Sequence, residues 1–232
     1  MTPVPARDAV AGLVAFEGPE GAGKSTQLAR AAAWLAARGQ PARVVREPGT
    51  SAVGQEIRRL LLDPAHDVVP AAEALLFMAA RAQLVERELR PALAAGELVL
   101  ADRFFLSTYA YQIHGRGLPE AEVVTANRLA TGGLVPDLTL LVRVPASVGL
   151  ARAGRRGAHD RMEQAGATFH ARVSEAFDRF ATADWQAAHP ECGPIVAVDG
   201  TGDEGAVFDR VAAALVARFP ALAGGAPGAG AQ

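Results

Sequence analysis

The sequence lacks several features, and each absence excludes a class of protein. Cys192 is the only cysteine, which excludes an intramolecular disulfide framework and a cysteine-based zinc site. No apolar run reaches the roughly 18 residues that a membrane-spanning helix needs. Residues 1–12 include Arg7 and Asp8 but no apolar stretch typical of a signal peptide. We therefore expect a cytoplasmic protein without a membrane partner.

Lysine is as rare as cysteine. Lys24 is the only lysine, although the chain is rich in arginine, alanine and glycine. A lysine retained against this bias indicates a position that requires a compact ammonium group. The formal net charge of -2 gives no reason to expect a nucleic-acid polymer as a partner. Small anions remain possible ligands, because a local group of arginines binds phosphate whatever the net charge.

The length of 232 residues suits one sizeable α/β domain. We place this domain at residues 13–220, after a flexible tail at residues 1–12. Residues 221–232 are mostly glycine, alanine and proline, a composition typical of disorder. The sequence thus predicts one folded unit between two tails.

The apolar pattern predicts strands that alternate with helices. The expected strands are residues 13–17, 42–46, 98–102, 138–144 and 195–198. The expected helices are residues 25–38, 54–62, 71–95, 147–156, 168–181 and 204–219. This alternation predicts an α/β fold, a five-stranded parallel sheet with helices on both faces. Ligands of such sheets bind beyond the carboxyl ends of the strands.

The segment from Gly18 to Ser25 reads G-P-E-G-A-G-K-S and fits the phosphate-loop pattern G-x-x-x-x-G-K-[ST]. It follows an expected strand and opens an expected helix, as the pattern requires. Backbone N–H groups and the helix dipole attract phosphate there, Lys24 reaches the β- and γ-phosphates, and Ser25 offers a hydroxyl to Mg²⁺. We expect a nucleoside triphosphate to contact Gly18, Pro19, Glu20, Gly21, Ala22, Gly23, Lys24, Ser25 and Thr26.

A phosphate loop alone does not decide the function, because GTPases, motor ATPases and small-molecule kinases all contain one. The guanine-reading N-K-x-D pattern is absent. Asp102 ends an apolar strand, as a Mg²⁺-binding carboxylate does. Arg103 and Arg46 also lie at strand ends, where two guanidinium groups could hold the phosphate of an acceptor. A simple strand-end turn is the alternative interpretation of Asp102-Arg103.

A further group of arginines follows the fourth expected strand. Gly154 and Gly157 flank part of this group, so we expect a mobile lid at about residues 150–162. An arginine from a lid can stabilise the charge of a phosphoryl group in transfer. A solvated helix face is the alternative for each member of the set Arg152, Arg155, Arg156 and Arg161.

The chain resembles bacterial thymidylate kinases over about residues 13–218. The order and spacing of several short segments carry the resemblance, since each segment alone is weak. These segments are residues 16–27, Arg46-Glu47-Pro48-Gly49, 58–63, 73–77, 80–83, Asp102-Arg103, 107–112, Gly115-Arg116-Gly117 and 136–139. The resemblance implies a P-loop nucleoside monophosphate kinase fold and a homodimer.

The resemblance also implies roles in the acceptor site. Phe77 would stack on thymine and Arg81 would hydrogen-bond its O4, from one face of a helix. Without the resemblance, Phe77 reads as a core residue. Tyr111 would crowd the 2′ position and so favour deoxyribose. The base and sugar would also contact Ser107, Thr108 and Gln112, and the acceptor phosphate would contact Arg46 and Arg103.

The donor side is assigned in the same way. Glu20 would lie near the acceptor 3′-hydroxyl or the water shell of Mg²⁺, and Asp199 lies in a segment that resembles the loop bordering adenine. Ser25 and Asp102 are the expected metal ligands. The family divides by whether its catalytic arginine lies in the phosphate loop or in the lid. This phosphate loop has no arginine, so we expect the lid type, with Arg156 and Arg161 as the catalytic arginines beside Lys24, Glu20 and Arg103.

The expected reaction is direct in-line transfer of the γ-phosphoryl group from MgATP to dTMP, which yields dTDP and ADP. One alternative is a kinase for another nucleoside monophosphate or for a deoxynucleoside. An alternative of a different class is a non-catalytic ATP-binding switch or scaffold that retains the fold.

Overall fold

The structure is a computed structural model that describes residues 10–154 and 160–224. Most of the two expected tails, residues 1–9 and 225–232, lies outside the described residues. Residues 155–159 of the expected lid also lie outside them. The end of the described chain is ordered, because Pro220–Gly224 form a 3-10 turn (η4) in which Leu222 is buried.

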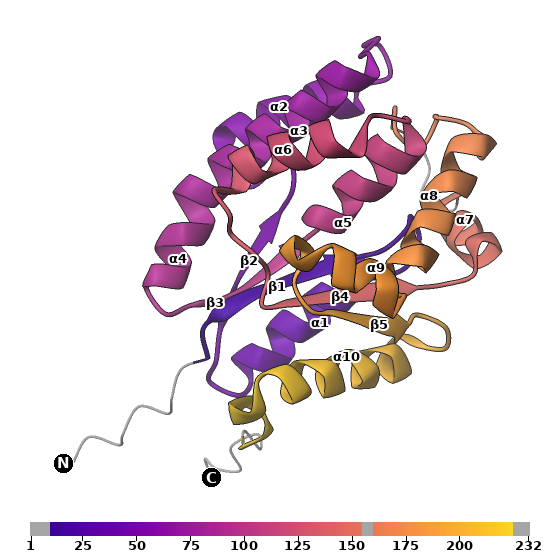
Figure 1. Cartoon of the computed structure of the whole chain (residues 1–232). Coiled ribbons are helices and arrows are strands. Elements are labelled where there is room, and N and C mark those ends of the chain that lie inside the picture. The colour runs from indigo at the N-terminus through magenta and orange to yellow at the C-terminus, as the bar shows by residue number, and fades with distance from the viewer. Residues whose placement is uncertain (1–9, 155–159, 225–232) are drawn as a thin grey trace.

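The centre of the fold is a sheet of five parallel strands in the order β2-β3-β1-β4-β5 (Figure 1). This confirms the expected α/β fold. The strands are β1 (Gly12–Glu17), β2 (Ala42–Arg46), β3 (Leu98–Asp102), β4 (Leu138–Arg143) and β5 (Ile195–Asp199). Each strand agrees with its expected range to within one residue at either end.

Helices connect the strands. The α-helices are α1 (Lys24–Ala36), α2 (Ala52–Leu62), α3 (Pro70–Leu84), α4 (Arg90–Ala94), α5 (Phe105–Thr108), α6 (Glu120–Thr131), α7 (Ala146–Gly154), α8 (Ala167–Phe180), α9 (Ala183–Ala188) and α10 (Glu204–Arg218). Two π-helical segments, η1 (Val85–Leu89) and η2 (Tyr109–Gly115), continue α3 and α5, and Pro190–Cys192 form the 3-10 turn η3. No helix within the described ranges combines the length and apolar character that a bilayer crossing demands.

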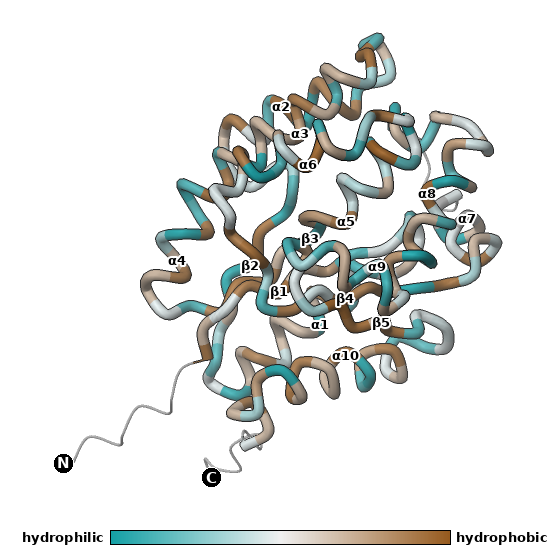
Figure 2. The backbone as a smooth tube through the Cα atoms, in the orientation of Figure 1, coloured by the Kyte–Doolittle hydropathy of each residue, from teal (hydrophilic) through white to brown (hydrophobic). Residues whose placement is uncertain are grey.

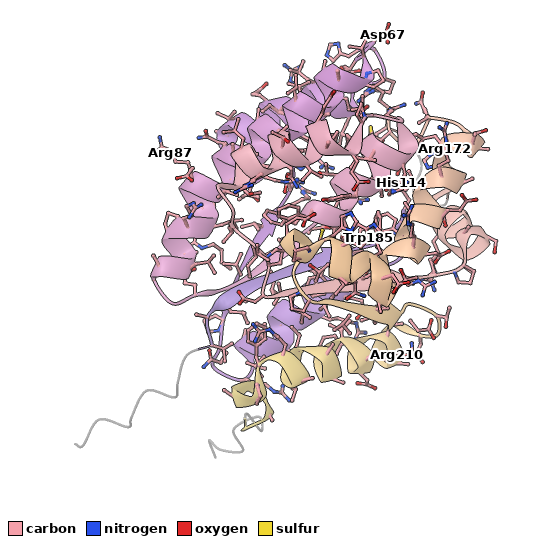
Figure 3. All side chains as sticks on the ribbon, viewed as in Figure 1. Asp67, Arg87, His114, Arg172, Trp185 and Arg210 are labelled. Atoms are coloured by element: carbon pink, nitrogen blue, oxygen red, sulfur yellow. The ribbon has the colours of Figure 1, made fainter. Side chains whose placement is uncertain are left out.

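The sheet separates two apolar cores. On one face, α1 and α10 cover β1, β3 and β4 through residues such as Leu28, Leu35 and Val211. On the other face, η1, α5, η2 and α8 pack around Phe104, Tyr109 and Phe177. Figure 2 shows hydrophobic stretches along the strands between these two layers. Charged side chains such as Arg87 and Arg210 point outward on opposite sides of the molecule (Figure 3).

The segment expected as one helix over residues 71–95 is helical but not uniform. It consists of α3, η1 and α4, and the amide of Arg90 bonds to the carbonyl of Val85 in the wider π pattern. Pro91 has no N–H to donate to the preceding turn, which accounts for the irregularity directly before it. The helices over residues 105–115 and 120–131 were not among the expected elements. Residues 105–113 are buried all round, so they lack the alternating apolar face from which a helix is read.

Candidate functional site

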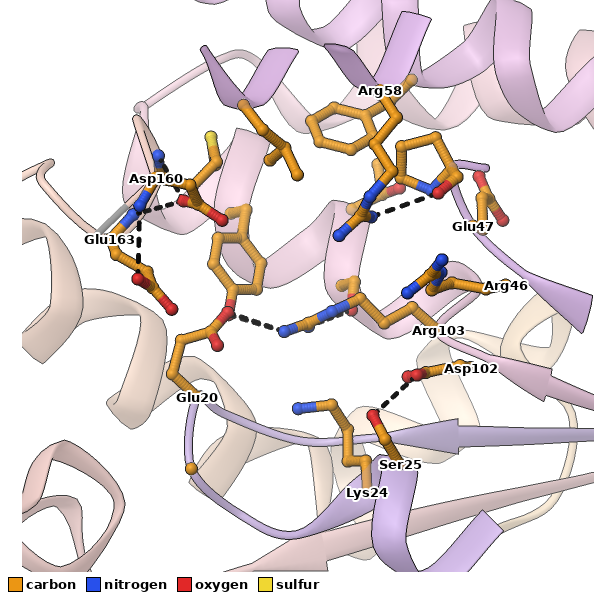
Figure 4. Close-up of a pocket in the computed structure, with 18 of the residues that line it drawn as sticks. Glu20, Lys24, Ser25, Arg46, Glu47, Arg58, Asp102, Arg103, Asp160 and Glu163 are labelled. Carbon is orange, nitrogen blue, oxygen red and sulfur yellow. Dashed lines mark hydrogen bonds and ion pairs between the residues drawn. The ribbon is translucent and has the colours of Figure 1, made fainter. Parts of the chain in front are cut away.

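A cavity of about 390 Å³ lies beyond the carboxyl ends of the strands (Figure 4). The phosphate loop and the start of α1 form one wall, and the ends of β2 and β3 form the floor. Residues of α2, α3, α5, η2 and the turn at 160–163 complete it. All eight residues expected to bind the acceptor line this cavity, namely Arg46, Phe77, Arg81, Arg103, Ser107, Thr108, Tyr111 and Gln112.

The phosphate loop owes its shape to glycines. Gly23 precedes α1 with a φ of 90°, a left-handed conformation that glycine adopts without strain. Gly21 has a φ of 71°, and a Cβ atom there would lie 2.0 Å from the carbonyl oxygen of Gly149 in α7. In turn, a Cβ on Gly149 would lie 2.7 Å from the carbonyl oxygen of Glu20. The loop and α7 therefore touch backbone to backbone.

Lys24 folds over the phosphate loop. Its Nζ donates a hydrogen bond to the carbonyl oxygen of Pro19 at 2.8 Å. Burial, followed by the positive charge of Arg103, lowers the pKa of Lys24 to about 8, although Glu20 and Asp102 oppose the shift. An anion that binds beside this buried ammonium group would stabilise its charged form.

Ser25 and Asp102, the two expected metal ligands, meet at the end of β3. Ser25 Oγ donates to Asp102 Oδ2 at 2.8 Å (Figure 4). The sheet register places Asp102 beside Phe16 of β1 and Arg46 of β2. A hydroxyl and a carboxylate next to a phosphate loop are the hard oxygen ligands that Mg²⁺ binds together with substrate phosphates, so this pair fits that ion.

Arg103 lies at the centre of the cavity. Its Nη1 donates to Ser107 Oγ at 2.8 Å, and its Nη2 donates to Glu20 Oε1 at 2.7 Å and to Tyr111 Oη at 3.3 Å. Burial tends to lower the pKa of Arg103, but Tyr111 and three nearby carboxylates outweigh burial and raise it. Arg103 has a φ of 73°, a conformation that strains a residue other than glycine by roughly 1–3 kcal/mol.

Tyr111 and Glu20 complete the contacts around Arg103. Tyr111 Oη donates to Glu20 Oε1 at 2.9 Å, and the guanidinium carbon of Arg103 lies 5.1 Å from the centre of the Tyr111 ring. Burial raises the pKa of the Tyr111 hydroxyl, so the hydroxyl keeps its proton. The phosphate loop and the chain after β3 are thereby linked across the cavity.

Arg81 is buried at the other end of the cavity. Its Nε donates to Glu47 Oε1 at 2.6 Å, its Nη2 donates to the carbonyl oxygen of Phe104 at 2.7 Å, and its Nη1 donates to Asn127 Oδ1. Glu47 is buried too, and burial raises its pKa to about 7 against the opposing charge of Arg81. The guanidinium group is thus held in one orientation beside Phe77.

Gln112 has a comparable support. Its Nε2 donates to Oε1 of Glu73 at 3.2 Å, and Glu73 is fully buried. Glu73 also accepts hydrogen bonds from Arg116 and, at 2.6 Å, from Arg161 Nη2. Arg161 Nε donates to the carbonyl oxygen of Leu61 at 2.8 Å. Arg161 is therefore tied beside the base end of the site and does not line the cavity in this structure.

The remaining expected residues divide into three groups. Gly18, Pro19 and Ala22 shape the loop without lining the cavity. Asp199 ends β5 and accepts hydrogen bonds from Thr201, outside the cavity, while Arg152 Nη1 reaches the nearby carbonyl oxygen of Gly200 at 3.4 Å. Arg155 and Arg156 lie outside the described residues.

The cavity also contains residues that the sequence did not single out for a role. Arg58 of α2 lines it and donates to the carbonyl oxygen of Pro48 at 3.2 Å, and burial and the charge of Arg46 lower its pKa. Asp160 and Glu163 line the opposite wall (Figure 4). A usable signal was present, because Arg58 stands in the segment 58–63 that carries the resemblance. It also lies four residues before Leu62, which lines the cavity from the same helix face.

The family model described as thymidylate kinase matches residues 16–188. A protein named thymidylate kinase from Deinococcus radiodurans is 46% identical over 208 residues, which cover 89% of this chain and 97% of the relative. One of the same name from Carboxydothermus hydrogenoformans is 46% identical over 165 residues, covering 71% and 81% of the two chains. One from Pseudomonas savastanoi pv. phaseolicola is 46% identical over 173 residues, covering 74% and 82%.

Proposed function

We infer that this chain, which belongs to the thymidylate kinase family, transfers the γ-phosphoryl group of ATP to dTMP and releases dTDP and ADP. The chain is a transferase of nucleotide biosynthesis that phosphorylates dTMP. The observation that carries the proposal is that one cavity holds the phosphate loop with Arg103 and Arg46 at one end and Phe77 and Arg81 at the other. Such a cavity has room for a donor phosphate and for a whole acceptor nucleotide.

The cationic side chains at the phosphate-loop end of the cavity would bind two different phosphate groups. Lys24 and the N–H groups of the loop would bind the β- and γ-phosphates of ATP. Arg103 and Arg46 would bind the phosphate of dTMP, because both guanidinium groups line the same side of the cavity at the ends of neighbouring strands. Glu20 pairs with Arg103 at 2.7 Å, so we propose that an acceptor phosphate competes with this carboxylate for the guanidinium group.

The base end would bind thymine between Phe77 and polar side chains. Arg81 keeps its guanidinium group in place through three acceptors, which supports its role as a donor to O4. Ser107, Thr108 and Gln112 would contact the base and sugar. Tyr111 would exclude a 2′-hydroxyl, since its ring lines the cavity and its hydroxyl is held by Glu20.

Transfer would proceed in line, without a covalent intermediate on the enzyme. The acceptor phosphate is anionic at neutral pH, so the reaction requires positioned charge rather than a strong base. We propose that residues 150–162 form a lid that excludes water and that Arg156 or Arg161 stabilises the transition state. Arg161 would first have to leave Glu73, to which it is bound at 2.6 Å.

We further propose Mg²⁺ as the cofactor, held by Ser25, Asp102 and the phosphates of ATP. The 2.8 Å contact between Ser25 Oγ and Asp102 Oδ2 supports this assignment. When bound, the ion would neutralise charge on the β- and γ-phosphates. Ser25 and Asp102 would orient it from the loop and from the end of β3.

A homodimer is also proposed. The helices α2, α3 and α6 lie side by side on one flank of the molecule (Figure 1). Their outer surface carries the exposed apolar side chains Val53, Leu60, Leu75 and Leu129. A second copy of the chain would cover this surface, since exposed apolar patches commonly mark interfaces. The proposed compartment is the cytoplasm, where ATP is abundant.

A panel of monophosphates tests the proposed reaction. We expect turnover with dTMP to exceed that with dUMP, UMP and AMP in an assay coupled to ADP release. Lys24→Ala is the control that should abolish turnover with all four, because it removes the cation from the donor phosphates. Faster turnover with UMP or AMP would contradict the proposed acceptor, and no turnover with any acceptor would favour a non-catalytic ATP-binding protein.

A further inference from the structure

Glu17 is a buried carboxylate for which the proposed reaction has no direct use. It is the last residue of β1, directly before the phosphate loop, and it is fully buried. A carboxylate in such a position needs hydrogen-bond donors, because an ionised group without partners is strongly destabilised in a protein interior. Its donors come from the chain that follows β3.

Three hydrogen bonds join Glu17 to the start of α5. Its Oε1 accepts from the backbone N–H of Phe104 at 2.7 Å and from that of Ser107 at 3.2 Å, and its Oε2 accepts from Ser107 Oγ at 2.6 Å. The first N–H groups of a helix have no partner within the helix. Phe104, which precedes α5, has no side chain that can accept their bonds. Glu17, at the end of β1, therefore caps the N-terminus of α5.

The capping bond to Phe104 lies directly after Arg103, which stands between Asp102 and Phe104. The backbone N–H of Arg103 donates to the carbonyl oxygen of Phe16 at 3.0 Å, on the same strand as Glu17. Arg103 adopts its left-handed φ of 73° at this point. The peptide on its carboxyl side is fixed by Glu17 through Phe104, so neighbouring residues of β1 hold Arg103 from both sides.

Glu17 also reaches the guanidinium group of Arg103 through one side chain. Ser107 Oγ donates to Glu17 Oε2 at 2.6 Å and accepts from Arg103 Nη1 at 2.8 Å. The other terminal nitrogen, Nη2, is then directed toward Glu20 and Tyr111 within the cavity. The carboxylate thereby determines both the backbone position and the side-chain direction of Arg103.

We propose that Glu17 is a positioning residue for Arg103, and that it sets the affinity of the site for the 5′-phosphate of the acceptor. This inference rests on the proposed role of Arg103 as a ligand of that phosphate. Glu17 acts more strongly on the phosphate than on the base, because Ser107 links it to the guanidinium group of Arg103. Its link to the base end runs through the backbone of Phe104, whose carbonyl oxygen accepts from Arg81. The effect is therefore visible as a difference between acceptors with and without a phosphate.

The test compares Glu17→Gln with the wild-type enzyme for binding of dTMP and of thymidine, by isothermal titration calorimetry. An amide has one oxygen in place of two, so at least one acceptor position is lost and a donor faces the N–H groups or Ser107. We expect the Kd of dTMP to rise about tenfold or more, and the Kd of thymidine to rise by a clearly smaller factor of about threefold or less. Equal weakening of both ligands, or unchanged binding of dTMP, would overturn the proposal.

Arg103→Ala and the double variant separate this proposal from the role of Arg103 itself. Arg103→Ala should abolish most of the preference for dTMP over thymidine, and adding Glu17→Gln should then change that preference no further. An unchanged preference in Arg103→Ala contradicts the phosphate role of Arg103, and with it both proposals. A preference lost in Arg103→Ala but kept in Glu17→Gln contradicts the role of Glu17 only.

Two further variants control for folding. Glu73→Gln alters another fully buried carboxylate, which holds Gln112 at the base end, and it should weaken dTMP and thymidine alike. Ser107→Ala replaces Glu17→Gln if the latter does not fold, as judged by circular dichroism. It keeps both backbone bonds to Oε1 and removes the hydroxyl between Glu17 and Arg103, so a severalfold loss of the preference for dTMP is expected. A folded Ser107→Ala enzyme with the wild-type preference would overturn the proposal.

Discussion

At the scale of single residues, Lys24 combines burial with a nearby cation. The pKa of Lys24 is about 8 when its ammonium group donates to the carbonyl oxygen of Pro19 and no phosphate is bound. Polyphosphate at this position would favour the protonated form and raise the pKa. The protonation of Lys24 therefore depends on whether ATP is bound. The number of protons taken up when ATP binds measures this dependence.

We predict that binding of ATP takes up protons between about pH 8 and 9. In this range a fraction of Lys24 is neutral in the free enzyme and becomes charged beside the phosphates. Calorimetry in buffers of different ionisation enthalpy measures the number of protons. Lys24→Arg keeps the charge but does not titrate in this range, so it should take up fewer protons. Equal proton uptake by both proteins would exclude Lys24 as the source.

Glu47 leads to a prediction about stability. Its pKa is raised to about 7 in the folded protein from 4.5, so the folded state binds more protons than the unfolded state between these values. The resulting contribution to the free energy of unfolding is fully present below about pH 4.5 and is lost as the pH rises through 7. We expect a loss on the order of 2–3 kcal/mol relative to Glu47→Gln, measured by urea unfolding across this range. Parallel pH profiles would contradict it.

Single residues also mark a limit of sequence reasoning. Arg81 and Gln112 were expected in the site, and both line the cavity. The buried carboxylates that hold them, Glu47 and Glu73, were noted only within motif segments. Their partners come from 34 and 39 residues away, and no local pattern reports such a contact.

At the scale of elements, the end of α7 and the turn at residues 160–163 are the described parts of the expected lid. Arg161 lies in that turn, and its backbone N–H donates to the carbonyl oxygen of Leu62 at 3.0 Å. Together with the bond to Glu73, this contact joins the end of the lid to α2 and α3. The base end of the site and the lid therefore share an anchor.

We predict that the two expected lid arginines differ in effect. Arg156→Ala should lower kcat about 10³-fold if it stabilises the transition state. Arg161→Ala should instead lower the free energy of unfolding by roughly 1–3 kcal/mol, because Glu73 loses one of its two cationic partners. Steady-state kinetics and thermal unfolding of both variants decide between these roles. A large loss of kcat without loss of stability in Arg161→Ala would make Arg161 a catalytic arginine.

Elements were predictable where their pattern is local. The apolar strands and the glycine-rich turn after β1 each have a short-range signature, and the strand-end rule placed Arg46, Asp102 and Arg103 together. The helical run from Phe105 to Gly115 has no such signature. Its side chains face both the core and the cavity, so buried residues do not alternate with exposed ones along it. The wider turn before Pro91 became clear only with the hydrogen bonds in view.

At the scale of the whole molecule, the flank formed by α2, α3 and α6 exposes several large apolar side chains to solvent. Leu75 is 62% exposed and Leu129 is 86% exposed. Two of these helices, α2 and α3, carry Arg58, Phe77 and Arg81 on their inner side. An interface on this flank would therefore support the walls of the active site from behind.

We predict that Leu75→Glu disrupts a homodimer. A carboxylate at the centre of an apolar interface should weaken the dimer by about 100-fold or more, and sedimentation velocity should show a monomer. Val196→Glu is the matched control, since Val196 is an exposed apolar residue on the edge strand β5, away from this flank. A wild-type protein that sediments as a monomer, or a Leu75→Glu variant that remains a dimer, would contradict the proposed interface.

The contact between Gly21 and Gly149 has a consequence for inhibitors. A side chain at either position would collide with backbone, at 2.0 Å in one case and 2.7 Å in the other. Resistance to a drug commonly arises through substitutions that reshape its binding surface, and these two positions cannot accept one without displacing the loop that holds the donor phosphates. A compound that extends from the phosphate loop onto this pair of glycines would therefore contact two positions at which a substitution also displaces the loop that binds the donor.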